Sequence, residues 1–213
     1  MALTYTKPKL IIGEGKSDMR FFQKLVMEHN LNDFQADWPK SERDPTGGWS
    51  KFGQYLRALH TSPTFVSVVR RVVVASDHDD DESFGRICKQ LKAADYSVPN
   101  APKQFVSTRN KPDIAILLIP DDTTGCLETL CYQAACVKWP GLQNPLENYL
   151  ARTPAGTWTA NKKDKMKIQC VLASTCEHSP DVRLQDHWQQ ADEFHIPVNI
   201  PPFQGIVDFL TSV

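Results

Sequence analysis

The sequence predicts an α/β fold with a central, mostly parallel sheet flanked by helices on both faces. Three apolar runs carry this prediction: residues 9–13, the β-branched run RRVVVAS that ends in SDHDDD, and residues 113–121. Each run is followed by a segment with helical periodicity. Strands that alternate with helices form parallel sheets covered on both faces, because each crossover returns the chain to the same end of the sheet.

The helical segments follow in order along the chain. Residues 17–29 predict a helix with Ser17 as its N-cap and an apolar face formed by Phe21, Phe22, Leu25 and Val26. Pro, Gly and charged residues predict a loop over residues 38–50, and a short amphipathic helix is expected over residues 51–60. Later helices are expected over residues 82–96, 125–137, 144–153 and 162–174, and a short amphipathic helix closes the chain.

Length and composition predict one globular domain. We expect a single domain over residues 1–213, with a core over about 8–136 and a helical C-terminal extension over about 140–213. Hydrophobic residues make up 41% and charged residues 23%, which excludes a disordered chain, and no apolar run is long enough for a membrane span. The N-terminus lacks a signal-peptide pattern, so we expect a cytoplasmic protein. With a net charge of −1, any nucleic-acid binding must rely on local patches or on metal.

Acidic residues stand where the predicted strands end. Glu14 follows the first strand, Asp77 and Asp79 belong to the acidic run after the second, and Glu128 lies in the helix after the third. The carboxyl ends of parallel strands share one edge of the sheet, where ligands bind. Carboxylates gathered there repel one another unless a cation neutralises them. The pattern therefore predicts a site for Mg²⁺ or Mn²⁺, which prefer oxygen ligands.

Other interpretations of these acids fit less well. The run IIGEGKS resembles the end of a P-loop, but Leu10 stands where that motif needs glycine, and Glu14 would repel a phosphate. The run DHDDDESFG resembles an EF-hand, but Glu82 and Cys88 replace the required glycine and glutamate. One aspartate is enough to cap a helix, whereas the run from Asp77 carries four acids in five positions.

The cysteines do not predict a disulfide framework or a zinc site. The chain has six cysteines and no C-x-x-C pair. Cys126, Cys131 and Cys136 are spaced by five, which scatters them around a helix. We expect reduced and mostly buried thiols.

Together, IIGEGKSD and VVVASDHDDD resemble the Toprim domain, which is shared by topoisomerases, bacterial primases, recombination-repair proteins and nucleases of the OLD family (overcoming lysogenization defect). The shared hallmark is a glutamate after a first strand, here Glu14, and an Asp-x-Asp pair after a later one, here Asp77 and Asp79. Small stand-alone Toprim proteins related to the OLD nucleases are similar over more of the chain, about residues 8–175. Their Gly-x-Leu-Glu segment resembles GCLETLC, and their late lysine-bearing helix resembles KKDKMKIQCVLAS.

This resemblance implies a role for each matching residue. Asp77 and Asp79 would hold a metal, Glu14 would bind metal or act as a general acid or base, and Asp18 and Glu128 could complete a second metal position. Lys165 or Lys167 would stabilise charge that develops on the scissile phosphate. The implied activity is metal-dependent hydrolysis of nucleic acid, DNA in preference to RNA, in phage defence or DNA repair. OLD nucleases are usually joined to an ATPase domain, so a separate ATPase partner or a homodimer is expected.

Two alternatives to a nuclease stay open. The near-neutral charge suits a phosphohydrolase or nucleotidyl transferase that acts on a small nucleotide, and a non-catalytic metal-binding or nucleic-acid-binding regulatory module would use the same acids. A basic cluster favours a nucleic-acid polymer as the substrate, and it comprises Lys162, Lys163, Lys165 and Lys167. Arg109 and Lys111, elsewhere in the chain, could add to it.

Overall fold

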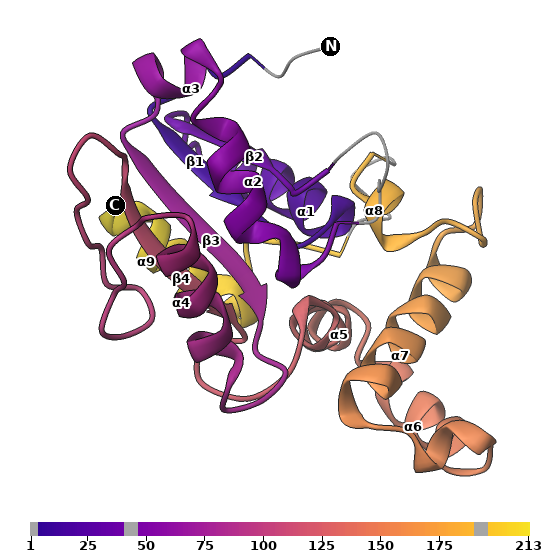
Figure 1. Ribbon diagram of the computed structural model, residues 1–213. Helices are drawn as coiled ribbons and strands as arrows, with labels where there is room; N and C mark the ends of the chain where they lie inside the picture. The colour runs from indigo at the N-terminus through magenta and orange to yellow at the C-terminus, as the bar shows by residue number, and fades with distance from the viewer. Residues whose placement is uncertain (1–3, 41–46, 190–195) are drawn as a thin grey trace.

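A four-stranded parallel sheet in the order β2-β1-β3-β4 is the centre of the computed structural model, which describes residues 4–40, 47–189 and 196–213 (Figure 1). All its strand pairs are parallel. The α/β class and the parallel sheet predicted from the sequence are thus confirmed. The strands are β1 (Lys9–Ile12), β2 (Phe34–Asp37), β3 (Arg71–Asp77) and β4 (Asp113–Ile119).

Helices cover both faces of the sheet, as predicted. Figure 1 shows α2 (Phe52–Leu59) and α4 (Ser83–Ala93) in front of the sheet and α9 (Gln204–Ser212) behind it. Strand residues alternate between two cores: Ile11 packs into the core with α9, and Ile12 packs into the core with α2 and α4. This alternation follows from the two-residue repeat of a strand. The remaining helices are α1 (Lys16–Glu28), α3 (Pro63–Val68), α5 (Leu127–Lys138), α6 (Gln143–Ala151), α7 (Ala160–Thr175) and α8 (Leu184–His187), with 3₁₀ turns at Trp49–Lys51, Pro140–Leu142, Pro154–Thr157 and Pro201–Phe203.

The start of α1 differs from the prediction. The N-cap is Gly15, and Asp18 accepts a hydrogen bond from the Gly15 N–H at 2.8 Å. Ser17 therefore lies inside the first turn, and its assignment as N-cap is wrong. The helix begins at this glycine because Asp18, at the third helical position, reaches back to the N–H of the N-cap residue, as the acidic partner of a capping box does. The predicted burial of Phe21, Phe22 and Leu25 is confirmed.

Strand β2 was not predicted from the sequence. Its four residues, FQAD, pair with β1 from Lys9↔Phe34 to Ile12↔Asp37. The segment is too short and too mixed in polarity to show a strand period, and tertiary pairing with β1 decides its conformation. The loop expected over residues 38–50 falls partly outside the described residues, at 41–46, and the helix expected over 51–60 is present as α2.

The strand order creates a switch point beside β1. The chain passes from β1 to β2 on one side of β1, and the later strand β3 pairs on the other side. Helices that follow β1 and β3 cover opposite faces, since α1 packs in one core and α4 in the other. The connections therefore diverge and leave a crevice at the carboxyl ends of β1 and β3, where open α/β sheets bind ligands.

The C-terminal part of the chain packs against the same core as the sheet. Ile168 of α7 and Leu210 of α9 belong to the core that contains α1 and α5. Figure 1 shows α6 and α7 beyond the tip of β3, on the side of the carboxyl edge. Within the described ranges, every helix is too short or too polar to span a bilayer.

Candidate metal centre

A pocket of about 450 Å³ opens at the carboxyl edge of the sheet. Three separate segments bring carboxylates to it: the β1–α1 turn, the end of β3 and the start of α5. Its charged lining is formed by Glu14, Lys16, Asp18, Asp77, Glu128 and Lys165. We call it the carboxylate pocket. The sequence prediction that Glu14, Asp77 and Glu128 meet at one edge is confirmed.

Glu14 is fixed in this pocket by two donors from β3. Its Oε1 accepts hydrogen bonds from the Ser76 hydroxyl at 2.5 Å and from the Asp77 N–H at 3.0 Å. Burial raises the pKa of the Glu14 carboxyl above its ordinary value, and the bonds to Ser76 and Asp77 oppose that rise. The carboxylate is thus both desolvated and oriented, two properties that suit a proton acceptor.

Two glycines make room for the backbone around Glu14. The Gly48 N–H donates to the Glu14 carbonyl oxygen at 2.7 Å. Gly47 has a φ of +73°, and a Cβ there would lie 2.4 Å from the same oxygen. On the other side, a Cβ at Gly13 would lie 2.4 Å from the Asp18 Cβ. The chain therefore needs glycine at Gly13 and Gly47 to carry Glu14 into the crevice.

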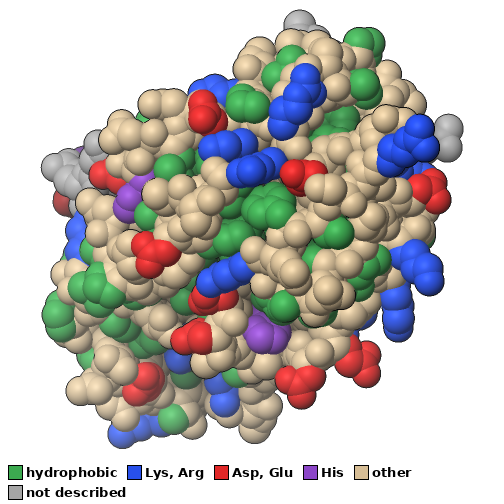
Figure 2. Space-filling view, turned by 90° about the vertical axis from the view of Figure 1, so that its left-hand side faces the viewer, with side chains coloured by type: hydrophobic (Ala, Val, Ile, Leu, Met, Phe, Trp, Pro, Cys, Tyr) green, Lys and Arg blue, Asp and Glu red, His purple; other side chains and the backbone are tan. Residues whose placement is uncertain are grey.

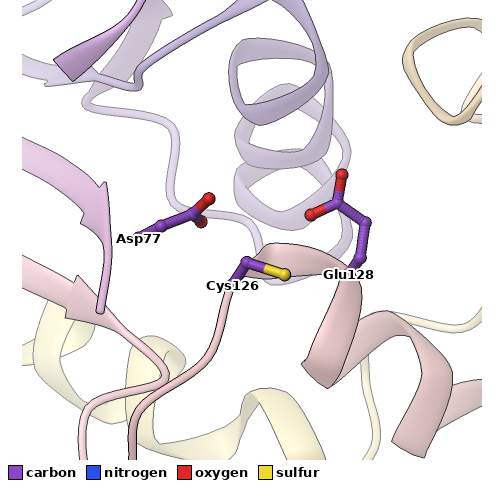
Figure 3. Close-up of side chains that lie close together, drawn as sticks. All are labelled: Asp77, Cys126 and Glu128. Carbon is purple, nitrogen blue, oxygen red and sulfur yellow. The ribbon is translucent and has the colours of Figure 1, made fainter. Parts of the chain in front are cut away.

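Asp77, Cys126 and Glu128 place one ligand atom each within 4.8 Å of one another. Figure 3 shows the Asp77 carboxylate extending from the end of β3 toward Glu128, with the Cys126 thiol directed to the same gap from the turn before α5. Asp77 Oδ1 also accepts the Leu127 N–H at 3.0 Å. This bond satisfies a free donor at the start of α5 and fixes the helix relative to β3.

Asp18 completes the acidic lining. Burial, and then the charge of Glu14, raises the pKa of the Asp18 carboxyl to about 7. Burial also raises the pKa of Asp77 well above its usual range, and the charges of Asp18 and Glu14 add to that rise. Charged groups of like sign in a desolvated pocket hold protons until a cation replaces them.

Lys165 is the cation that faces these acids. Its ammonium lies 3.8 Å from the Glu128 carboxylate. Burial lowers the pKa of Lys165, but the surrounding negative charges, led by Glu128 and Asp77, together raise that pKa above its ordinary value. Lys16 also lines the pocket, and it pairs with Asp186 of α8 at 3.3 Å.

The donor set fits a divalent cation with a preference for oxygen. Asp18, Asp77 and Glu128 offer carboxylate oxygens, as Mg²⁺ and Mn²⁺ require. A cation would relieve the raised proton affinity of Asp18 and Asp77, since binding exchanges protons for metal. Cys126 departs from a pure Mg²⁺ set, because a thiol is a softer ligand that Mn²⁺ and later transition metals accept more readily.

Asp79 and Lys167 lie apart from the pocket lining. Asp79 is exposed and accepts a hydrogen bond from the Asn161 amide of α7 at 2.6 Å. Lys167 pairs with Asp164 at 3.2 Å and lies 4.6 Å over the Tyr132 ring. The metal role of Asp79 and the catalytic role of Lys167 stay predictions that these contacts do not support.

The rest of the acidic run supports the start of α4. Asp80 accepts the Glu82 N–H at 2.9 Å, and its carboxylate pairs with Arg86. This pairing lowers the pKa of Asp80. Asp80 thus stabilises the turn before α4, whose N-cap is Glu82, whereas Asp77 points into the carboxylate pocket.

Two participants were missed by sequence reasoning. Ser76 is buried and supports Glu14, and its place immediately before Asp77 in a strand was the available signal. Cys126 was expected to be a buried thiol, which is confirmed, but its proximity to Asp77 and Glu128 was not foreseen. Spacing within a helix could not reveal it, because Cys126 is the N-cap residue, where the chain turns toward β3.

The fold and the pocket define an α/β protein with a carboxylate-lined crevice at the switch point of a parallel sheet. The chain belongs to the family described as "Protein of unknown function (DUF3226)", whose model matches residues 8–212. No curated protein matches the chain, and no solved structure matches it.

Cys126→Ser is expected to weaken Mn²⁺ binding by about ten-fold while Mg²⁺ binding changes by less than about two-fold. Burial, followed by the charges of Glu128 and Asp77, raises the pKa of Cys126 to about 12, so the thiol is neutral until a metal displaces its proton. Calorimetric titration with each metal measures the effect. Cys170→Ser, on α7 and outside the pocket lining, is the control. Equal losses for both metals would exclude Cys126 as a selective ligand.

Proposed function

We propose that the carboxylate pocket hydrolyses phosphodiester bonds of nucleic acid with Mg²⁺ or Mn²⁺, as a Toprim-like nuclease related to the OLD family. The observation that carries this proposal is the convergence of four carboxylates and two lysines in one crevice. Such a convergence destabilises the metal-free protein, so a role in cation binding accounts for it better than a structural role. The sequence resemblance to Toprim proteins, which rests on Glu14, Asp77 and Asp79, supports the same conclusion.

The residues divide into three roles in this proposal. Asp18, Asp77 and Glu128 would hold the metal, which when bound lowers the pKa of water and neutralises charge on the phosphate. Glu14 accepts a proton from the attacking water at Oε2, because Oε1 is already occupied by Ser76 and Asp77. The Lys165 ammonium stabilises negative charge as it develops on the phosphate oxygens.

The proposed substrate is DNA in preference to RNA. Figure 2 shows a face on which acidic and basic side chains are interspersed, in keeping with the net charge of −1. A polymer would be held by the pocket and by the basic N-terminal half of α7. A separate ATPase or a second copy of the chain is the proposed partner, as in the multidomain OLD nucleases.

A small-nucleotide phosphohydrolase or nucleotidyl transferase is the second candidate. The volume of the pocket favours it, since about 450 Å³ falls within the range for small-ligand sites. A non-catalytic metal-binding module would use the same carboxylates but would need no lysine beside them. An assay separates the candidates, because the nuclease cleaves nucleic acid, the small-nucleotide enzyme consumes free nucleotide and the binding module consumes neither.

The deciding experiment incubates the purified protein with supercoiled plasmid, single-stranded DNA and free nucleoside triphosphates, each with Mg²⁺, with Mn²⁺ and with a chelator. We expect nicking of plasmid with either metal and none with the chelator. Turnover of nucleotides with intact plasmid would replace the nuclease by the small-nucleotide enzyme. Metal binding without any turnover would reject both enzymes and leave the binding module.

A further inference from the structure

The turn at the start of α5, which carries the candidate metal ligands Cys126 and Glu128, is held by the hydroxyl of Thr129. Thr129 is the third residue of the helix, and its Oγ1 accepts a hydrogen bond from the Cys126 N–H at 3.1 Å. The Thr129 N–H donates to the Cys126 carbonyl oxygen at 2.9 Å. Such reciprocal bonds close the first turn of a helix. The hydroxyl therefore fixes the stretch of chain from which both ligands project.

The hydroxyl proton of Thr129 is taken by α7. Thr129 Oγ1 donates to Asp164 Oδ2 at 2.8 Å. A hydroxyl has one proton and two acceptor lone pairs, so in the 3.6 Å contact between Thr129 Oγ1 and Cys126 Sγ the thiol is the donor. One oxygen atom thus orders both the N–H and the thiol of Cys126, because Asp164 accepts its proton.

Gly125 leaves the space in which this hydroxyl lies. A Cβ at Gly125 would lie 2.9 Å from Thr129 Oγ1 and 2.9 Å from Pro120 Cδ. The Gly125 N–H also donates to the His78 carbonyl oxygen at 2.8 Å, which ties the turn to the chain immediately after β3. A larger residue at Gly125 would therefore push the Thr129 hydroxyl away from Cys126.

Asp164 uses both of its carboxylate oxygens at the contact between α5 and α7. Its side chain is only 14% exposed, and Oδ1 pairs with the Lys167 ammonium at 3.2 Å, while Oδ2 accepts the Thr129 hydroxyl. The Lys167 ammonium in turn lies 4.6 Å from the centre of the Tyr132 ring on α5. A carboxylate that is partly desolvated and bonded at both oxygens holds its geometry more firmly than an exposed ion pair does.

The bond from Asp164 also sets the direction in which Lys165 projects. The two residues are consecutive on α7, and consecutive residues of an α-helix project about 100° apart around its axis. With Asp164 bonded to Thr129, Lys165 lies 3.8 Å from Glu128, the residue before Thr129. Two adjacent residues of α7 therefore contact two adjacent residues of α5, which opposes both sliding and rotation of α7.

We propose that Thr129 and Asp164 are positioning residues of the metal centre, which hold the turn with Cys126 and Glu128 in place to receive a cation. Neither residue lines the carboxylate pocket, so each acts through the residues beside it. Groups that orient metal ligands in this way change metal affinity by about ten-fold to a hundred-fold. The inference rests on the metal centre of the proposed function, and it applies equally if that centre cleaves nucleic acid, turns over a small nucleotide or only binds metal.

Calorimetric titration with Mn²⁺, in the absence of any substrate, tests this inference. Thr129→Val keeps the size of the side chain but removes the hydroxyl, and it is expected to weaken Mn²⁺ binding by about ten-fold or more. Thr129→Ser keeps the hydroxyl and is expected to bind Mn²⁺ within about two-fold of the parent. The control is Thr175→Val, which removes a hydroxyl that donates to the Val171 carbonyl oxygen at the far end of α7 and is expected to leave Mn²⁺ affinity unchanged. Melting curves verify that each variant folds.

A double-mutant cycle tests whether Thr129 acts through Asp164. Asp164→Ala alone is expected to weaken Mn²⁺ binding, and to weaken it little further in the Thr129→Val background, because both changes break the same bond. Additive losses would overturn the link between the two residues, since the lost negative charge of Asp164 would then act independently of Thr129.

The outcomes separate this inference from the proposed function. Parent-like Mn²⁺ affinity in Thr129→Val, or equal weakening in Thr129→Ser and Thr129→Val, would overturn the inference and leave the metal centre in place. Equal weakening in Thr175→Val would overturn it too, because a general loss of α7 stability would then account for the effect. A parent that binds no Mn²⁺ would reject the metal centre and this inference together, whereas a parent that binds Mn²⁺ but cleaves no plasmid would reject only the nuclease.

Discussion

Asp77→Asn is expected to abolish metal-dependent plasmid cleavage, lowering the rate by about three orders of magnitude or more. Asp77 is the carboxylate that meets Cys126 and Glu128 within 4.8 Å, so its loss removes a central ligand. The asparagine side-chain oxygen can still accept the Leu127 N–H, which keeps α5 in place. Nicking rates at saturating Mn²⁺ measure the effect, and thermal melting of the metal-free variant verifies the fold.

The matched control is Asp81→Asn. Asp81 belongs to the same acidic run but is exposed and outside the pocket lining, so the same charge change there is expected to leave cleavage within about two-fold of the parent. A variant Asp77→Asn that nicks plasmid as fast as the parent would falsify the metal-centre hypothesis. Loss of activity in both variants would show instead that general acidity, rather than a defined ligand, is required.

Mg²⁺ is expected to raise the melting temperature by about 5 to 10 °C near pH 8 and by little near pH 5.5. The folded-state pKa of Asp18 is about 7, above its ordinary value of 3.8. A carboxyl whose pKa is raised on folding favours the folded state below pH 3.8, and this contribution is lost as pH rises toward 7. The metal-free protein therefore becomes less stable over this window, while the metal finds deprotonated ligands only at its upper end.

Asp18→Asn separates these two effects. Removing the charge is expected to raise the melting temperature of the metal-free protein near pH 8, by the equivalent of about 1 to 3 kcal/mol, and to reduce the shift caused by Mg²⁺. The amide oxygen can still accept the Gly15 N–H, so the start of α1 is preserved. Scanning calorimetry at the two pH values, with KCl to match ionic strength, gives the comparison. A parent protein whose metal-induced shift is equal at both pH values would contradict the linkage.

The sequence predicted those strands that contain a long apolar run, because such a run is typical of a buried parallel strand. Strands β3 and β4 contain long apolar runs, so both were found, and the parallel pairing of β3 with β1 placed Glu14 and Asp77 at one edge. Strand β2 escaped because its four residues owe their conformation to pairing with β1. A local sequence pattern cannot predict a strand that forms only by pairing with another strand of the folded sheet.

The site was predictable in its acids and not in their supports. The positions of Glu14 and Asp77 follow from the ends of the strands. The supports of Glu14 do not, because Ser76 lies 62 positions away in the sequence and Gly47 acts through a turn with positive φ. The exposed location of Asp79 also needed the structure, because β3 ends at Asp77 and the turn that follows it brings Asp79 to Asn161 of α7. Contacts between remote segments leave no periodicity in the sequence.

The contact between Lys165 and Glu128 has a consequence for how the protein can be divided. Every carboxylate of the pocket is encoded before residue 129, whereas its facing lysine comes from α7, after a stretch of turns and the short α6. A chain shortened before α7 would retain all the acids and Lys16 but would lose Lys165, the lysine that pairs with Glu128. The charges of the pocket are therefore fully assembled only when the last third of the chain has folded onto the first.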